Sequence, residues 1–212
     1  MEETLEPRKP DAAPQEGLGR YSGYLALGVL IIIGGTVSTY VGNYMTTFAA
    51  TTLKLSPTVS LSATAVGGAS IFVLSLLGGW LGDRFGRKPL VILPRLALML
   101  LIVPLFKWTY SSPSATTLWL TSIAVSGLTA MSAGISLVIL PELLPRHIRA
   151  TGFAIVYAVG VAIFGGSTQL VVAWLANITG DPAAPAWYVV VTSLCTVGAA
   201  LALPETRGRS IN

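Results

Sequence analysis

Six apolar segments, each long enough to cross a lipid bilayer, constrain this chain more than any other feature. A bilayer is crossed by about 20 apolar residues, and its interior offers no water to backbone N–H and C=O groups. A helix satisfies those groups within itself, so we expect an all-α membrane protein with six transmembrane helices. The segments span about 21–50, 57–81, 90–107, 116–140, 150–176 and 186–203.

The composition agrees with a membrane protein and argues against several other classes. Hydrophobic residues make up 53% of the 212 residues and charged residues only 10%, against about 25% charged in soluble domains. The net charge of +4 does not indicate nucleic-acid binding, because the cations lie between apolar segments. One cysteine, Cys195, and one histidine, His147, predict neither a disulfide framework nor a metal site. We expect no cofactor.

The ends of the chain differ in composition from the apolar part. Residues 1–20 are polar, acidic and rich in proline, which is typical of a disordered arm or a linker remnant. The first apolar segment is too long for the core of a signal peptide. We therefore divide the chain into an arm at 1–20, a six-helix bundle at 21–204 and a tail at 205–212.

Lysine and arginine predict the orientation of the bundle in the membrane. Of the 13 Lys and Arg residues, all except Lys54 and Lys107 lie in the arm, the tail and two of the connections, when the first of these is extended to Arg95 at the start of the third segment. These connections join the second segment to the third and the fourth to the fifth. Cytoplasmic loops carry such an excess, so we expect both termini in the cytoplasm and the protein in the cell (inner) membrane, surrounded by lipid.

Two sets of small residues indicate close helix packing, because small side chains let helix backbones approach in lipid. In the fifth segment the set recurs every four residues, and the fourth segment has a similar set. The alternative is chance in a chain rich in Ala and Gly. Pro94 and Pro104 predict a kinked third segment. The sets are Ala150, Ala154, Ala158, Ala162 and Gly166, and Ser122, Ser126, Ala130 and Gly134.

The connection GGWLGDRFGRKPL, 78–90, places one carboxylate, Asp83, among cations between two apolar segments. A carboxylate beside an arginine is stabilised in one arrangement and loses that stabilisation when the neighbouring helix moves away. We therefore consider Asp83 part of a conformational latch, closed against Glu142 and Arg149 at the start of the fifth segment. The alternative is that the cations only orient the protein and Asp83 moderates them. The other latch candidates are Gly79, Arg84, Gly86, Arg87 and Lys88.

Residues 79–88 closely resemble the signature loop of the major facilitator superfamily, G-x-L-x-D-R-x-G-R-[KR], at every fixed position. The stretches 141–166, PELLPRHIRATGFAIVYAVGVAIFGG, and 179–188, TGDPAAPAWY, resemble the later helices of its metabolite:proton symporters, and 203–208 resembles the end of their last helix. Within that family the spacing is most similar to citrate and related carboxylate symporters. The resemblance implies that residues of about 21–208 form helices seven to twelve, the C-terminal half of a transporter.

Such a transporter has two six-helix halves with the substrate between them. The resemblance therefore leaves open a truncated reading frame, a split transporter, a fragment or a pseudo-two-fold dimer of this chain. The implied activity is alternating-access symport of a small organic acid with protons. A compatible-solute carrier for proline or betaine, and a membrane module that does not transport, are the alternatives. We expect no enzymatic activity, because no nucleophile–base pair or phosphate-binding loop is present.

Polar residues on one face of the first segment are the candidates for substrate contact, because polar groups deep in a membrane helix face a cavity or the bundle interior. The alternative is hydrogen bonding between helices. Gly34–Gly35 and Gly165–Gly166 are candidate flexible points in their helices. The substrate candidates are Thr36, Tyr40, Asn43, Tyr44 and Thr47, with Tyr157 from the fifth segment; Ser126, Ser132, Ser136 and Gln169 are weaker candidates.

A carboxylate symporter needs charged residues near the middle of the membrane, and this sequence offers none that we expect to lie there. We expect no Lys, Arg or His near the middle of any segment, and Arg95 to lie near the cytoplasmic end with its side chain reaching the interface. No Asp or Glu occupies a mid-membrane position as a proton carrier either. The charges that meet an anion and carry a proton would then come from a second half.

Overall fold

The computed structural model describes residues 18–204, and every regular element within that range is a helix. Six helices are long and apolar enough to cross a membrane, which confirms the predicted fold class and number of segments. Residues 1–17 and 205–212, with Glu205, lie outside the described residues. After a 3-10 turn at Leu18–Tyr21, the elements are α1 (Ser22–Thr51), α2 (Pro57–Phe85), α3 (Arg87–Ser111), α4 (Ala115–Glu142), α5 (Arg146–Ala158), the π-helix η2 (Val159–Gly165), α6 (Gly166–Thr179) and α7 (Ala184–Ala202).

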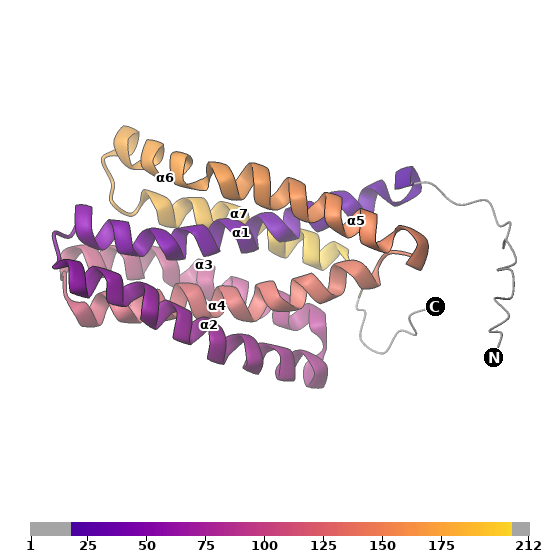
Figure 1. Ribbon diagram of the computed structural model, residues 1–212, viewed down its shortest axis with the longest axis horizontal. Coiled ribbons are helices and arrows are strands. Elements are labelled where there is room, and N and C mark those ends of the chain that lie inside the picture. The colour runs from indigo at the N-terminus through magenta and orange to yellow at the C-terminus, as the bar shows by residue number, and fades with distance from the viewer. Residues whose placement is uncertain (1–17, 205–212) are drawn as a thin grey trace, which may run out of the picture.

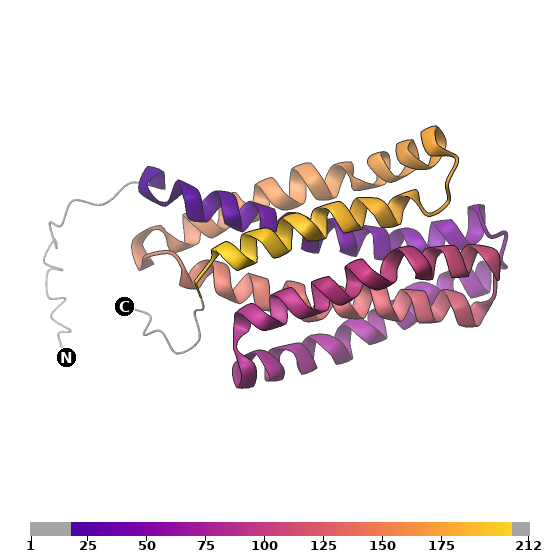
Figure 2. The same cartoon turned by 180° about the vertical axis from the view of Figure 1, so that it is seen from behind.

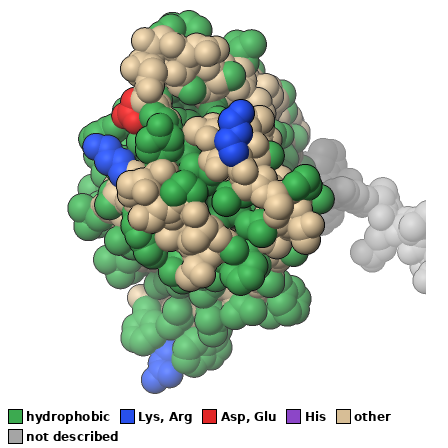
Figure 3. Space-filling view, turned by 90° about the vertical axis from the view of Figure 1, so that its left-hand side faces the viewer, with side chains coloured by type: hydrophobic (Ala, Val, Ile, Leu, Met, Phe, Trp, Pro, Cys, Tyr) green, Lys and Arg blue, Asp and Glu red, His purple; other side chains and the backbone are tan. Residues whose placement is uncertain are grey.

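The helix α1 is central and contacts α2, α4, α7 and all three parts of the fifth span, α5, η2 and α6. The fifth span lies on one side of α1, and α2 and α4 lie on the other side (Figures 1 and 2). The α2–α3 and α4–α5 connections, the start of α1 and the end of α7 lie at one end of the bundle, on the right in Figure 1. At the opposite end, Lys and Arg side chains are sparse and scattered (Figure 3). That the basic end faces the cytoplasm stays a prediction.

Apolar side chains fill the interior of the bundle and also cover its outer surface, where a lipid environment favours them. Val37, Leu98 and Phe106 are completely buried between helices. Large apolar side chains also point outward, among them Leu100 at 77% and Leu170 at 74% exposure. Burial alone therefore does not separate interior from surface, and small and polar residues determine which faces pack together.

The helices of the fifth span pack differently from the prediction. Ala150, Ala154, Ala158, Ala162 and Gly166 are all exposed in the described bundle, so the expected close packing of this face is wrong there. The close approach is made by glycines on another face. A Cβ on Gly160 would lie 2.4 Å from Ile32 Cγ2, and one on Gly152 2.6 Å from Leu144 Cδ1. Gly152 and Gly160 lie eight residues apart on this face with the buried Val156 between them, whereas four of the five small residues on the exposed face are alanines.

The predicted close packing of the fourth segment is found in part: it holds at the buried Ser122 and Ser126 of α4, but Gly134 is exposed with nothing within 4 Å of an added Cβ. Cβ atoms on Gly42 of α1 and on Gly67 of α2 would each lie 3.1 Å from the Ser126 Oγ atom. Three helices therefore meet at this hydroxyl. Helix α3 continues without interruption through Pro94 and Pro104.

Candidate functional site

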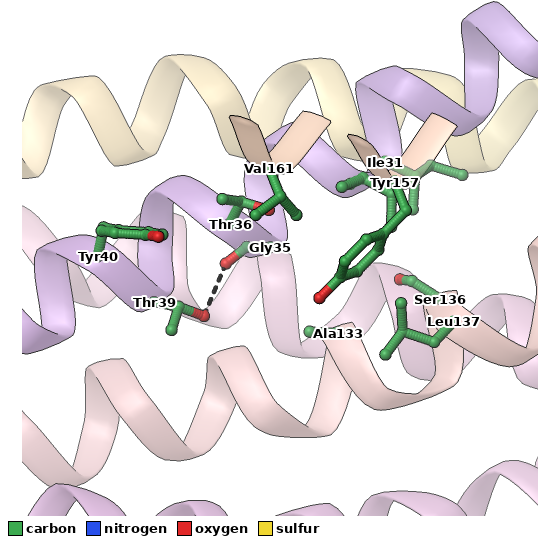
Figure 4. Close-up of a pocket in the computed structure, with 11 residues that line it drawn as sticks. Ile31, Gly35, Thr36, Thr39, Tyr40, Ala133, Ser136, Leu137, Tyr157 and Val161 are labelled. Atoms are coloured by element: carbon green, nitrogen blue, oxygen red, sulfur yellow. Dashed lines mark hydrogen bonds between the residues drawn. The ribbon is translucent and has the colours of Figure 1, made fainter. Parts of the chain in front are cut away.

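A pocket of about 300 Å³ lies between α1, α4 and the fifth span (Figure 4). We refer to it as the tyrosine pocket, after Tyr40 and Tyr157. Figure 4 shows the Tyr157 ring pointing from the fifth span toward α4, so that its hydroxyl and that of Ser136 face the same space. The pocket is lined by Ile31, Ile32, Gly35, Thr36, Thr39, Tyr40, Ala133, Ser136, Leu137, Tyr157 and Val161.

A second pocket of about 250 Å³ lies between α1, α2 and α4, and we refer to it as the asparagine pocket. Asn43 lines it from α1, and Ser126 and Thr129 from α4. Thr39 lines both pockets, as do Ala133 and Leu137. The two spaces are therefore neighbours along one face made by α1 and α4, on which hydroxyl and amide groups lie among apolar side chains.

The predicted substrate residues fall into three groups. Thr36, Tyr40 and Tyr157 are brought together in the tyrosine pocket, and Asn43 lies in the asparagine pocket. Tyr44 lines neither of these pockets; it packs against the hydrophobic core with its ring 6.1 Å from that of Phe48. Thr47 is exposed and also lines neither.

The weaker candidates also separate. Ser136 lines the tyrosine pocket and Ser126 the asparagine pocket. Ser132 is fully buried behind them. The Gln169 side chain donates a hydrogen bond of 3.2 Å to the Tyr40 carbonyl and so fixes α6 against α1. The sequence reasoning missed Thr39, although it lies on the same helical face as Thr36 and Asn43.

Among the glycines of α1, Gly34 makes the closest approach to a neighbouring helix, and Gly35 follows it at the next position. A Cβ on Gly34 would lie 2.0 Å from Thr196 Oγ1 of α7. Gly35, on the pocket side, borders Ala133 of α4. The two glycines therefore let α7 and α4 pack against two different sides of the same turn of α1.

Arg95 contradicts the sequence prediction. It does not extend toward the interface: its side chain is 1% exposed and reaches inward from α3 to α1 and α4. Its Nη1 donates to the Gly34 carbonyl at 2.9 Å and to Ser38 Oγ at 2.7 Å, and its Nε donates to Ser132 Oγ at 3.1 Å. Among the described residues it has no carboxylate partner. The bundle thus contains an interior positive charge, which the sequence analysis had assigned to a missing half.

The prediction for Arg95 was wrong because it considered how deep the residue lies along its helix and not which face of the helix it occupies. Arg95 lies about 12 Å along α3 from Arg87, at 1.5 Å per residue. At that depth a lipid-facing arginine could extend to the interface. Val91, Leu98 and Ile102 are buried at helical spacing around Arg95, so all of them face inward. That apolar periodicity is the signal that could have located it.

The charged connection between α2 and α3 depends on Gly86. Its φ of 104° and ψ of 155° are essentially restricted to glycine, and they turn the chain directly from one helix into the next. Lys88 then donates to the Leu201 and Leu203 carbonyls at 2.7 and 2.8 Å, which joins this turn to the end of α7. The glycine of the motif is therefore required by the backbone.

The remaining latch candidates do not form one cluster in this structure. Arg87 Nη1 forms an ion pair with Glu142 Oε1, between the start of α3 and the end of α4. Arg149 donates to the Leu144 carbonyl at 3.2 Å and thus holds the α4–α5 turn. Asp83 is exposed and makes no ion pair with a described residue, although it lines a pocket with Arg87.

Two further latch candidates lie beside these groups. The Arg84 guanidinium lies 5.6 Å from the ring centres of both Trp80 and Phe85. Gly79 borders the pocket that Asp83 and Arg87 also line. The latch itself stays a prediction.

Comparison with known proteins identifies the family. The sequence profile described as Major Facilitator Superfamily matches residues 22–211. The chain belongs to this superfamily. Its relatives are transporters and not enzymes, so the predicted absence of enzymatic activity agrees with them. The resemblance predicted from the signature loop is confirmed, and it extends over nearly all of the chain.

Three relatives within the superfamily are informative. The citrate-proton symporter of Salmonella typhi is 30% identical over 82% of this chain and 41% of its own length. The citrate-proton symporter of Klebsiella pneumoniae is 29% identical over 79% of this chain and 38% of its own length. The ectoine/proline transporter of Corynebacterium glutamicum is 30% identical over 86% of this chain and 36% of its own length. The chain spans about two fifths of the length of the curated relatives that it matches.

Proposed function

We propose that the chain forms the C-terminal six-helix half of a transporter that moves a small organic acid together with protons by alternating access. The tyrosine pocket carries this proposal. It presents hydroxyl groups from three different spans, and relative movement of those spans would change the exposure of a bound solute. The similarity to two citrate-proton symporters supports an organic acid and proton coupling.

A compatible solute such as proline or betaine is the alternative substrate. The similarity to an ectoine/proline transporter favours it, and so do the two aromatic rings of the pocket. Tyrosine rings attract quaternary and other ammonium groups through cation–π contacts. Citrate has no such group, so the alternatives differ in what Tyr40 and Tyr157 would contact.

We infer that a second six-helix half, or a second copy of this chain, covers part of the exposed surface. The five small residues of the fifth span, Ala150 to Gly166, are exposed here at four-residue spacing. Lipid chains pack against large and small side chains alike, whereas a closely approaching helix needs small ones. The exposed face of the fifth span therefore suits a helix of the partner.

Uptake into proteoliposomes tests the proposed function. We expect the purified chain, with its partner half or as an oligomer, to accumulate labelled citrate when the external solution is acidified, and to lose that accumulation when a protonophore is added. Stronger competition by betaine than by unlabelled citrate would select the compatible-solute alternative. Absence of uptake at every proton gradient would identify a membrane module that does not transport.

The predicted latch leads to a separate expectation for Asp83→Asn. Because Asp83 pairs with no described residue here, its neutralisation should leave the melting temperature unchanged. If the carboxylate closes the latch in another conformation, uptake should slow by about 5- to 150-fold, from a coupling free energy of about 1–3 kcal/mol. Initial uptake rates and thermal melting of the same preparation measure both.

Asp181→Asn is the matched control at the other end of the bundle. Asp181 accepts a hydrogen bond of 2.8 Å from the Ala183 backbone N–H, and asparagine retains that acceptor. We expect no change in uptake for this variant. Undiminished uptake by Asp83→Asn would exclude the latch.

A further inference from the structure

Arg95 carries an inference that rests on the proposed function and makes its substrate class more specific. One guanidinium nitrogen, Nη2, has no hydrogen-bond partner among the described residues. The other two nitrogens are held by α1 and α4, so the group has a fixed orientation. A buried guanidinium without a counter-charge is unfavourable by several kcal/mol. Such a group is therefore typical of a site completed by an anion.

The free nitrogen lies directly behind the wall of the tyrosine pocket. It is 3.4 Å from the position that a Cβ would take on Gly35, and that position is 3.5 Å from the Cβ of Ala133. Both residues line the pocket. Apart from the backbone of α1 itself, Nη2 and the Ala133 Cβ are the only described atoms within 4 Å of that position. Figure 4 shows Gly35 and Ala133 on the wall that faces Tyr157.

We propose that the missing side chain of Gly35 leaves an opening through which Arg95 binds the carboxylate group of the transported solute. A carboxylate oxygen in the tyrosine pocket at Gly35 accepts a hydrogen bond from Nη2 and supplies the negative charge that the buried guanidinium lacks. The hydroxyls of Thr36 and Tyr157 line the same pocket and are available to the rest of the solute.

The proposal also explains why organic acids and compatible solutes both occur among the relatives. Citrate, ectoine and proline share a carboxylate and differ in the rest of the molecule. An arginine behind the pocket recognises the shared group, while Tyr40 and Tyr157 contact the part that differs. Carboxylate recognition is therefore independent of which substrate the chain transports.

Gly35→Ala tests the proposal without removing Arg95. The added methyl group would make ordinary contacts of 3.4 and 3.5 Å, so we expect the fold and the three existing hydrogen bonds of Arg95 to be retained. The methyl group closes the opening, and loss of a charge-assisted hydrogen bond weakens carboxylate binding by about ten- to hundredfold. Gly68→Ala is the control, because nothing lies within 4 Å of its added Cβ.

The measurement is ligand-dependent thermal stabilisation of the purified full chain by citrate, proline and betaine. Prolinamide and choline, which lack the carboxylate, serve as paired probes. We expect Gly35→Ala and Arg95→Gln to weaken the binding of carboxylates and to leave that of the paired probes unchanged. The double variant should lose no more than either single variant, because both remove the same contact.

Two results would overturn the proposal. One is equal carboxylate affinity in the unaltered chain, Gly35→Ala and Arg95→Gln. The other is a folded chain stabilised by none of the three carboxylates. Failure of transport is a distinct result: carboxylate binding that depends on Arg95 without any uptake would reject the transport function and keep the site. Normal uptake by both variants would reject the site and keep the transport function.

Discussion

Replacing Gly34 with alanine should lower the melting temperature of the purified chain in detergent. The added Cβ would lie 2.0 Å from Thr196 Oγ1 and 3.0 Å from the Thr192 carbonyl oxygen of α7. The second of these atoms is backbone, so no change of rotamer relieves the contact. Helices α1 and α7 must move apart, and we expect a loss of about 1–3 kcal/mol from overpacking.

The Thr196 hydroxyl makes the effect larger than a simple clash. Its single proton is shared between the Leu30 carbonyl at 3.1 Å and the Thr192 carbonyl at 3.2 Å, so the hydroxyl cannot leave without losing this hydrogen bonding. Thr196→Ala in the Gly34→Ala background removes the shortest contact and should recover part of the lost stability. Gly35→Ala, one residue away, is the matched control. If the Gly34→Ala chain had the same melting temperature as the unaltered chain, α1 and α7 would not be packed this closely.

Gly34 also shows how far the sequence determined the fold. The six spans could be predicted because bilayer thickness and the placement of charges act on whole segments. The helix boundaries differ from that prediction by only a few residues at most ends. The identity of the packed faces could not be predicted in the same way. In the fifth span, the face with the regular four-residue repeat of small residues is exposed, and the face that contains Gly152 and Gly160 packs against Ile32 and Leu144.

The candidate site was partly predictable for the same reason. Thr36 and Tyr40 could be found because polar residues at helical spacing in an apolar segment indicate an interior face. Tyr44 has the same side chain as Tyr40 and directly follows Asn43. Its packing against Phe48 depends on the folded bundle and could not be predicted from helical spacing. Arg95 needed knowledge of its neighbours, because Ser38 and Ser132 come from other helices and become its partners only in the folded bundle.

The π-helix η2 was not predicted, since no residue pattern specifies it. It lies where the fifth span crosses α1, and π-helical turns occur frequently at functional sites. At its end, a Cβ on Gly165 would lie 2.7 Å from Thr36 Cγ2 and 2.9 Å from Tyr40 Cε2. Both of those residues line the tyrosine pocket, so the glycine determines how far they extend into it.

Gly165→Ala should therefore reduce transport strongly. The added methyl group must displace the Tyr40 ring and the Thr36 side chain, or separate α1 from the fifth span. Either response alters the tyrosine pocket, and a loss of 1.4 kcal/mol in solute binding alone lowers affinity by about tenfold. We expect initial uptake rates in proteoliposomes to fall by about that factor or more.

Gly166→Ala separates this contact from the general effect of alanine on a helix. Both substitutions replace a glycine with a better helix former by one methyl group, but nothing lies within 4 Å of a Cβ on Gly166. Alanine keeps the small size of the other four residues on the face proposed for the partner helix, so we expect Gly166→Ala to transport like the unaltered chain or to be slightly more stable. Similar uptake by the two variants would mean that the crossing of the fifth span over α1 does not control the pocket. A loss confined to Gly165→Ala, with normal membrane insertion, would show that the crossing positions Thr36 and Tyr40 for the solute.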